Sequence, residues 1–279
     1  MDMETKERTK RPASVYSKKI IEMRRICKIA FDKGLIDTHS GNISVGAGSD
    51  ILITKTGASL VDLQLSDFTA VPFKYENRYD LIYSRARGGQ FNLKRTQTAD
   101  KVSSNALNVN EASSELKIHE FILNSFPEAT VFHAHPLNAI ALSLKTCNDG
   151  SGNKLESAAS PPLSFGSPAL APPLFPLPSS FKKLYSQYPD LDIIRPVDFE
   201  SAYFFPEIYI FPLSFITDIK SGNLKLKLKA KDIFKENGVF MIKSHGSFSW
   251  GKTPLDALRW TIMLEASSEI ILKSSRSSP

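Results

Sequence analysis

Two histidines separated by a single residue are the clearest candidates for chemistry in this sequence. His133 and His135 lie in segment 129–135, whose apolar residues predict a strand that stops at Pro136. Residues i and i+2 project from the same face of a strand, so both imidazoles can reach one metal ion. Taken alone, the pair also fits two ordinary histidines at a strand edge.

A metal ion at this pair needs at least one more protein ligand. Catalytic zinc is held by three protein ligands and keeps a fourth position open. His245 is a candidate, because it follows the apolar segment 239–242, which predicts a strand, and precedes Gly246. Spacing along the chain does not by itself place His245 beside the other two histidines.

The segment Ser113-Ser114-Glu115 opens a predicted helix over 113–126 and has two interpretations. In the simpler one, the serines cap the helix and Glu115 is favoured by its positive end. In the functional one, Ser113, Ser114 and the helix N-terminus bind phosphate, and Glu115 is an acid/base beside the metal. His119, on the apolar stripe of this helix, is expected to be a core or supporting residue and not a ligand.

Two further turns consist of small residues, Ser40-Gly41-Asn42 and Thr56-Gly57-Ala58-Ser59. As turns they need no special explanation. Exposed backbone amides next to hydroxyls would also suit an anion.

The remaining periodicity predicts helices and strands that alternate along the chain. Helices are expected over 14–33, 113–126, 139–145 and 224–234 and from Thr253 onward, and strands at 43–45, 51–54, 129–135, 193–197, 208–211 and 239–242, with a short helix and a strand within 60–73. Such interspersion indicates a mixed α/β class, but it does not give the order of the strands.

The organisation that we expect is a basic tail over 1–12 followed by one domain over 13–279. Two long insertions interrupt that domain, a polar one at about 74–110 and a proline-rich one at about 148–190. Proline at this density excludes a regular helix or a central strand.

Composition limits the classes of protein that fit. Of the 279 residues, 42% are hydrophobic and 23% are charged, which argues against general disorder. No apolar run approaches the roughly 20 residues of a membrane span, and two cysteines form no disulfide framework, so a cytoplasmic location is expected. The net charge of +6 is spread along the chain, which argues against nucleic acid or membrane as a partner and is compatible with small anionic substrates.

Taken together, these motifs resemble the class II aldolase/adducin family. Five segments follow in the family's order: Ser40-Gly41-Asn42-Ile43-Ser44, Ile53-Thr54-Lys55-Thr56-Gly57, Ser113-Ser114-Glu115, His133-Ala134-His135-Pro136 and His245-Gly246. The likeness covers roughly residues 15–73, 111–145 and 200–273. Each motif alone is unspecific, and their order is what carries the resemblance.

The resemblance implies a three-layer α/β/α fold with a largely antiparallel central sheet. It implies Zn²⁺ or another divalent metal on His133, His135 and His245, with Glu115 as the catalytic carboxylate. The positions that match the family's phosphate-binding loops are Gly41, Asn42, Thr56, Gly57, Ser113 and Ser114. Family members are commonly homotetramers, so a homo-oligomer is expected.

The implied activity is that of a metal-dependent aldolase. Such an enzyme cleaves or forms a sugar phosphate through an enediolate of a hydroxyketone phosphate, and the fuculose-phosphate type resembles this sequence. Epimerase, dehydratase and decarboxylase activities share the fold, although the pentose-phosphate epimerases tend to carry Asp where Glu115 stands. A non-catalytic adducin-like interaction module is the alternative of another class, and such modules lose the metal ligands.

One family feature has no counterpart here. In the aldolases, a tyrosine near the C-terminus of a neighbouring subunit helps to handle the aldehyde, but no tyrosine follows Tyr209 in this sequence. The aldehyde, the sugar length and the stereochemistry are therefore left open.

Overall fold

An eight-stranded sheet organises the structure. The computed structural model describes residues 13–48, 50–73, 111–145, 184–204, 207–222 and 229–274. The sheet order is β3-β2-β1-β4-β8-β7-β6-β5, and each neighbouring pair is antiparallel except β6 and β7. The strands are β1 (Asn42–Ala47), β2 (Asp50–Thr54), β3 (Phe68–Pro72), β4 (Thr130–Ala134), β5 (Asp192–Ile194), β6 (Ile208–Phe211), β7 (Gly238–Ile242) and β8 (Gly246–Gly251). The predicted, largely antiparallel sheet is thus confirmed.

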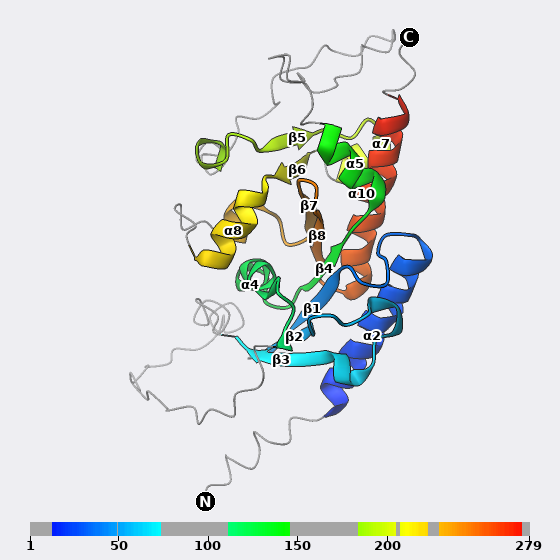
Figure 1. Ribbon diagram of the computed structural model, residues 1–279, viewed down its shortest axis with the longest axis vertical. Coiled ribbons are helices and arrows are strands. Elements are labelled where there is room, and N and C mark those ends of the chain that lie inside the picture. The colour runs from blue at the N-terminus through cyan, green and yellow to red at the C-terminus, as the bar shows by residue number, and fades with distance from the viewer. Residues whose placement is uncertain are drawn as a thin grey trace, which may run out of the picture.

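Helices cover both faces of the sheet (Figure 1). On one face lie α4 (Leu116–Ser125), α8 (Leu213–Ser221) and α9 (Ala230–Ile233), and on the other lie α2 (Ala13–Asp32), α5 (Leu137–Lys145) and α10 (Pro254–Ser274). The short helix α7 (Phe199–Phe204) contacts α10, and two 3-10 turns, η1 (Leu60–Asp62) and η2 (Leu65–Asp67), lead into β3. The three-layer α/β/α prediction is therefore confirmed.

Strand alternation divides the core into two sides. In β4, Val131 packs with the α4 and α8 side chains, whereas the next residue, Phe132, packs with α2 and α10. Both residues are fully buried, which explains why the central strands are apolar on successive positions. Cys27 of α2 is also fully buried, and this burial raises the pKa of its thiol, as expected of a structural cysteine.

Some elements depart from the sequence prediction. The strand β8 and the helices α7 and α8 were not predicted. Of the helix predicted over 224–234, residues 224–228 lie outside the described residues, whereas Lys229 is extended and α9 spans only Ala230–Ile233. The Asp232 carboxylate accepts a hydrogen bond from the Lys229 backbone amide at 2.9 Å, which starts a new short helix at that point.

Three further predictions fall wholly or mostly outside the described residues. These are the basic tail over 1–12, the insertion at 74–110 and most of the insertion at 148–190. The end of the second insertion is described, and there Leu184 and Tyr188 are buried in the core. Within the described ranges, none of the helices has the length and apolar character needed to cross a bilayer.

Candidate metal centre and catalytic base

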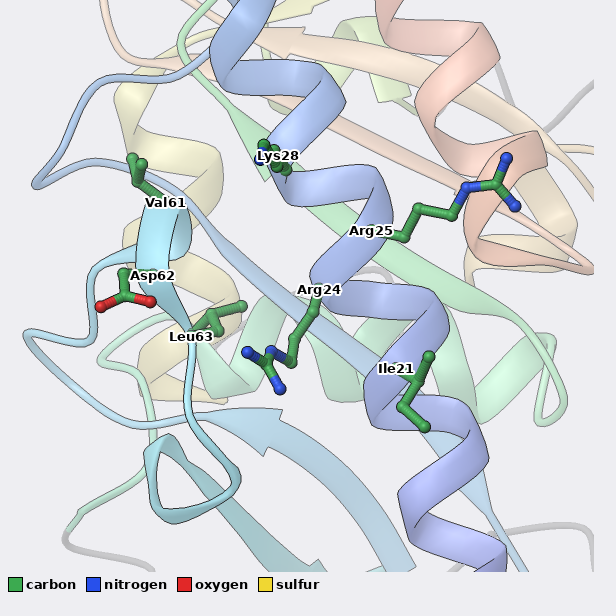
Figure 2. Close-up of a pocket in the computed structure, with 7 residues that line it drawn as sticks. All are labelled: Ile21, Arg24, Arg25, Lys28, Val61, Asp62 and Leu63. Carbon is green, nitrogen blue, oxygen red and sulfur yellow. The ribbon is translucent and has the colours of Figure 1, made fainter.

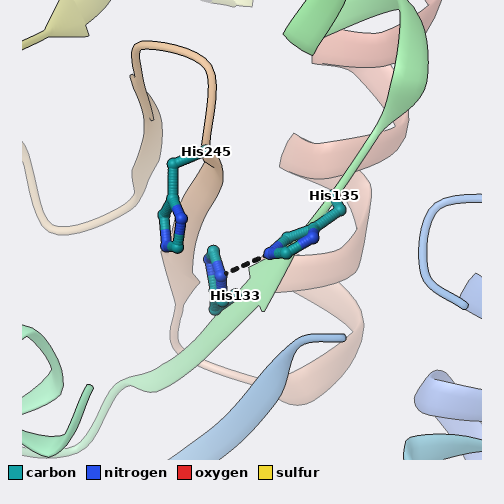
Figure 3. Close-up of side chains that lie close together, drawn as sticks. All are labelled: His133, His135 and His245. Carbon is teal, nitrogen blue, oxygen red and sulfur yellow. Dashed lines mark hydrogen bonds between the residues drawn. The ribbon is translucent and has the colours of Figure 1, made fainter. Parts of the chain in front are cut away.

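Three histidines from two distant parts of the chain meet at one end of the sheet (Figure 3). His133 lies in β4, His135 directly follows that strand, and His245 lies in the turn between β7 and β8. One nitrogen from each imidazole lies within 4.8 Å of the other two, and the Nε2 atoms of His133 and His135 are 2.9 Å apart. A tetrahedral zinc ion with Zn–N distances of about 2.1 Å needs nitrogens about 3.4 Å apart, so small side-chain movements would suffice. These residues could hold a divalent metal ion.

Strand pairing brings His245 to His133. In the antiparallel β4–β8 pair, His133 lies opposite Phe248, and the β7–β8 turn then places His245 over the end of β4. The turn needs unusual backbone, since Ser244 adopts a positive φ of 58°. Glycine is required at position 246 because β4 passes very close to it. A Cβ there would lie 2.6 Å from the Ala134 carbonyl oxygen and 2.9 Å from His133 Cε1.

The His133 ring is held in one orientation. Its Nδ1 donates to the Ser247 carbonyl oxygen at 2.9 Å, which turns the lone pair of Nε2 toward the other histidines. Phe248 stacks on the ring at a centroid distance of 4.2 Å. Burial lowers the pKa of His133 to about 3 and also lowers that of His135, so both are neutral at pH 7, the form that binds metal.

The Glu115 carboxylate lies against this group of histidines. Its Oε1 accepts a hydrogen bond from His245 Nε2 at 2.7 Å, and its Oε2 is 3.3 Å from His133 Nε2. Burial alone would raise its pKa, but His133 and His245 together with a hydrogen bond from Asn42 outweigh burial and bring the pKa well below the ordinary value. An ionised, buried carboxylate therefore borders the candidate metal centre.

Gly41 and Asn42, two of the predicted phosphate-binding residues, run beside β4. Gly41 has a φ of +90°, and a Cβ there would lie 2.7 Å from the His133 carbonyl oxygen. The Asn42 side chain is buried, and its Nδ2 donates to Glu115 Oε2 at 2.7 Å. This contact with Glu115 was not predicted from the sequence.

The other four predicted phosphate-binding residues lie on two adjoining loops. A β-bridge joins Lys55 to Ala112, Thr56 Oγ1 donates to the Ala112 carbonyl oxygen at 2.8 Å, and the Ser113 amide donates to the Thr54 carbonyl oxygen. Gly57 and Ser114 are exposed, whereas Ser113 is buried and its hydroxyl accepts from the Glu115 amide. The structure thus brings these loops together beside Glu115, and their binding of phosphate stays a prediction.

Two supporting residues complete the described surroundings of Glu115. His119 is fully buried and is not one of the clustered histidines, as expected for a supporting residue. Its ring contacts Asn42 and Ser44, and Ser44 was not singled out from the sequence. The available signal was its spacing, because Ser44 lies two residues after Asn42 and hence on the same face of β1.

One surface pocket lies apart from these residues. It has a volume of about 330 Å³ and lies between α2 and the η1 segment (Figure 2). Its lining residues are Ile21, Arg24, Arg25, Lys28, Val61, Asp62 and Leu63. None of them is among the residues predicted to bind metal or phosphate.

Solved structures of known proteins share this fold. L-fuculose-1-phosphate aldolase from Thermus thermophilus matches with a TM-score of 0.53 and 19% identity, over 92% of this chain and 95% of that one. YgbL from Klebsiella pneumoniae matches with a TM-score of 0.54 and 15% identity, over 94% and 92% of the two chains. YgbL from Escherichia coli gives a TM-score of 0.52 and 18% identity, over 90% and 87%. At these identities the likeness shows the fold alone, and a comparison with curated protein sequences gave no match.

The family assignment comes from the sequence itself. The profile of the family described as Class II Aldolase and Adducin N-terminal domain matches residues 21–272, which is most of the chain. A match of this extent, on a fold whose strands bring His133, His135, His245 and Glu115 together, shows that the chain belongs to the class II aldolase and adducin family.

Proposed function

We propose that this protein is a metal-dependent aldolase that cleaves or forms a sugar phosphate. The observation that carries the proposal is the position of Glu115. Its buried carboxylate lies 2.7 Å from His245 Nε2 and 3.3 Å from His133 Nε2, so a proton-transfer group borders a candidate metal centre. A metal-dependent aldolase uses both the metal ion and the proton-transfer group. The ion polarises a carbonyl group, and the second group moves a proton at the carbon next to it.

Zinc is the ion that we propose for the histidines. Three imidazoles with one open position form the donor set of catalytic zinc, and Gly246 lets the chain pass close to His133 and His135. A divalent ion bound there supplies Lewis-acid polarisation of a substrate carbonyl group.

Glu115 acts as the acid and base. In cleavage, the carbon–carbon bond beside the ketone breaks, and the proton of the neighbouring hydroxyl passes to solvent as its oxygen becomes the aldehyde carbonyl. The electron pair stays on the carbon next to the ketone, which takes a proton that Glu115 has taken up from solvent. In synthesis, Glu115 removes that proton before the carbon attacks the aldehyde.

The adjoining loops are proposed to hold the substrate phosphate. Backbone amides at Gly57 and at the start of α4, with the hydroxyls of Ser113 and Ser114, offer donors to an anion beside Glu115. The Thr56 hydroxyl donates to the Ala112 carbonyl oxygen in this structure and would turn to join them. This arrangement suits a small hydroxyketone phosphate whose reacting carbon faces the carboxylate.

The alternatives differ in what they require of this site. Epimerase, dehydratase and decarboxylase reactions could use the same metal centre and carboxylate, so the geometry does not separate them. A non-catalytic adducin-like module needs neither a metal centre nor a catalytic carboxylate. In this protein, the histidines and Glu115 are brought together from separate elements of the fold.

Exchange of solvent deuterium into dihydroxyacetone phosphate tests the proposal. The zinc-loaded protein should catalyse this exchange, and Glu115→Gln should lose at least about 100-fold in rate, as expected when a general base is removed, while one metal ion per chain is retained. His39→Ala is the matched control, because His39 is exposed and is not one of the three clustered histidines. Undiminished exchange in Glu115→Gln would falsify the role of Glu115.

A cleavage screen then separates the aldolase from its alternatives. Phosphorylated keto-sugars should yield an aldehyde and a hydroxyketone phosphate only when zinc is present. Stereochemical inversion, loss of water or release of carbon dioxide in place of an aldehyde would assign one of the other reactions.

A further inference from the structure

A buried chain of hydrogen bonds runs from the sheet to the Glu115 carboxylate. Ser44 Oγ lies 2.6 Å from His119 Nδ1, His119 Nε2 is hydrogen-bonded to Asn42 Oδ1, and Asn42 Nδ2 lies 2.7 Å from Glu115 Oε2. Ser44 and His119 are completely buried, and Asn42 and Glu115 are each 7% exposed. Water has little access to these groups, so each must find its partner within the chain.

The chemistry of the groups fixes the direction of every bond. A carboxylate accepts, so the Asn42 amide nitrogen faces Glu115 and the amide oxygen faces His119. That oxygen needs a donor, which must be His119 Nε2–H. Burial lowers the pKa of His119 to about 4, so the ring is neutral at pH 7 and its Nδ1 accepts from the Ser44 hydroxyl.

The fold places these residues by simple spacings. Asn42 and Ser44 are two residues apart on β1 and therefore project from the same face. His119 follows Glu115 by four residues, which puts the two side chains on the same side of α4. Phe248 packs against the His119 ring edge-on, with centroids 6.0 Å apart, and holds that ring in place.

We infer that Ser44, His119 and Asn42 position the Glu115 carboxylate for proton transfer. The series of hydrogen bonds ends at the Asn42 side-chain amide, which donates to Glu115 Oε2. This bond fixes the plane of the carboxylate and leaves Oε1 turned toward His245 and the incoming substrate. This inference rests on the proposed role of Glu115 as the base. Asn42 and His119 are positioning residues, and a carboxylate free to rotate would meet the reacting carbon less often.

The kinetic test uses three variants and one matched control in zinc-loaded protein. His119→Leu should lower kcat for deuterium exchange into dihydroxyacetone phosphate by about 10- to 100-fold, with KM and zinc content unchanged. His119→Gln keeps a donor for Asn42 and should recover most of this loss, and Ser44→Ala should lower kcat by several-fold. Ser249→Ala is the control, because Ser249 is equally buried and its hydroxyl bonds to Thr261, on the opposite face of the sheet.

The outcome is decided by the pattern across these variants. Equal kcat values for His119→Leu and Ser249→Ala, with a loss of stability in both, would show a structural role and overturn the inference. The same applies if His119→Gln is no better than His119→Leu.

A spectroscopic readout keeps the inference testable without activity. Histidine ¹⁵N spectra of the zinc-loaded wild type should show the His119 ring protonated on Nε2 with Nδ1 as a hydrogen-bond acceptor, and the signal is assigned to His119 by its loss in His119→Leu. A His119 ring protonated on Nδ1 would overturn the inference even if exchange occurs. Absent exchange in a wild type with the expected tautomer would instead count against the base role of Glu115, and the positioning role would fall with it.

Discussion

At the scale of single residues, a few histidines and glycines decide whether the site can form. The spacing of His133 and His135 made them candidates, because alternate residues of a strand share a face, and the resemblance to the family then implied that they are ligands. The role of Gly246 could not be predicted in this way. Position 246 must lack a Cβ because the Ala134 carbonyl group lies too close, and Ala134 is far from Gly246 in the sequence.

Substitution of Gly246 should therefore damage metal binding. In Gly246→Ala, the new Cβ would lie 2.8 Å from His135 Cδ2 and 2.9 Å from His133 Cε1, so both rings must move. We expect zinc affinity to fall by at least about 10-fold, measured by competition with a chromogenic chelator. Gly238→Ala in β7 is the control, since its Cβ would meet only the Trp250 side chain, and equal affinities in the two variants would contradict this account.

The buried His119 should make stability depend on pH. Its pKa is about 4 in the folded protein and about 6.5 when unfolded, so protons favour the unfolded state. The contribution is complete above pH 6.5 and is lost as the pH falls toward 4. Between pH 7 and pH 5 we expect this residue to account for about 2 kcal/mol of the fall in the free energy of unfolding.

Urea unfolding of metal-free protein at pH 7 and pH 5 measures this contribution. His119→Gln cannot titrate, so its free energy of unfolding should fall by about 2 kcal/mol less than that of the wild type over the same interval. Identical falls would mean that His119 is not buried in its neutral form.

At the scale of elements, local signals predicted most helices and strands. The hairpin of β1 and β2, the strands β4 and β7 and the helix α10 lie where periodicity placed them. The strand β8 was missed although Phe248 and Trp250 alternate with serines, because the flanking glycines indicate turns. The helix α8 was missed as well, and its end is marked by Gly222, which adopts the left-handed conformation.

The start of α10 provides a test of local signals. Thr253 Oγ1 accepts from the Asp256 amide at 3.1 Å, and Asp256 Oδ2 accepts in return from the Thr253 amide at 3.2 Å, so Thr253 caps the helix. Thr253→Ala should lower the free energy of unfolding by about 1 kcal/mol and leave zinc affinity unchanged. Thr217→Ala in the exposed middle of α8 should change the free energy of unfolding by less than about 0.5 kcal/mol. Similar changes in the two variants would contradict a specific capping role of Thr253.

At the scale of the whole molecule, long-range pairing creates the site. His245 joins His133 because β8 pairs with β4, although the two histidines are far apart in the sequence. No local pattern encodes that pairing, and the third histidine could be proposed only from a resemblance to a family. Glu115 likewise reaches the histidines because α4 packs on the face of the sheet from which His133 projects.

Zinc titration of metal-free protein tests the central claim most directly. We expect one ion per chain in the wild type and in His39→Ala, in which an exposed histidine that is not one of the three clustered histidines is removed. His245→Ala should bind zinc more weakly by more than about 100-fold, because one of three protein ligands is lost. A wild type that binds no stoichiometric zinc, or equal affinities in His245→Ala and His39→Ala, would contradict the account.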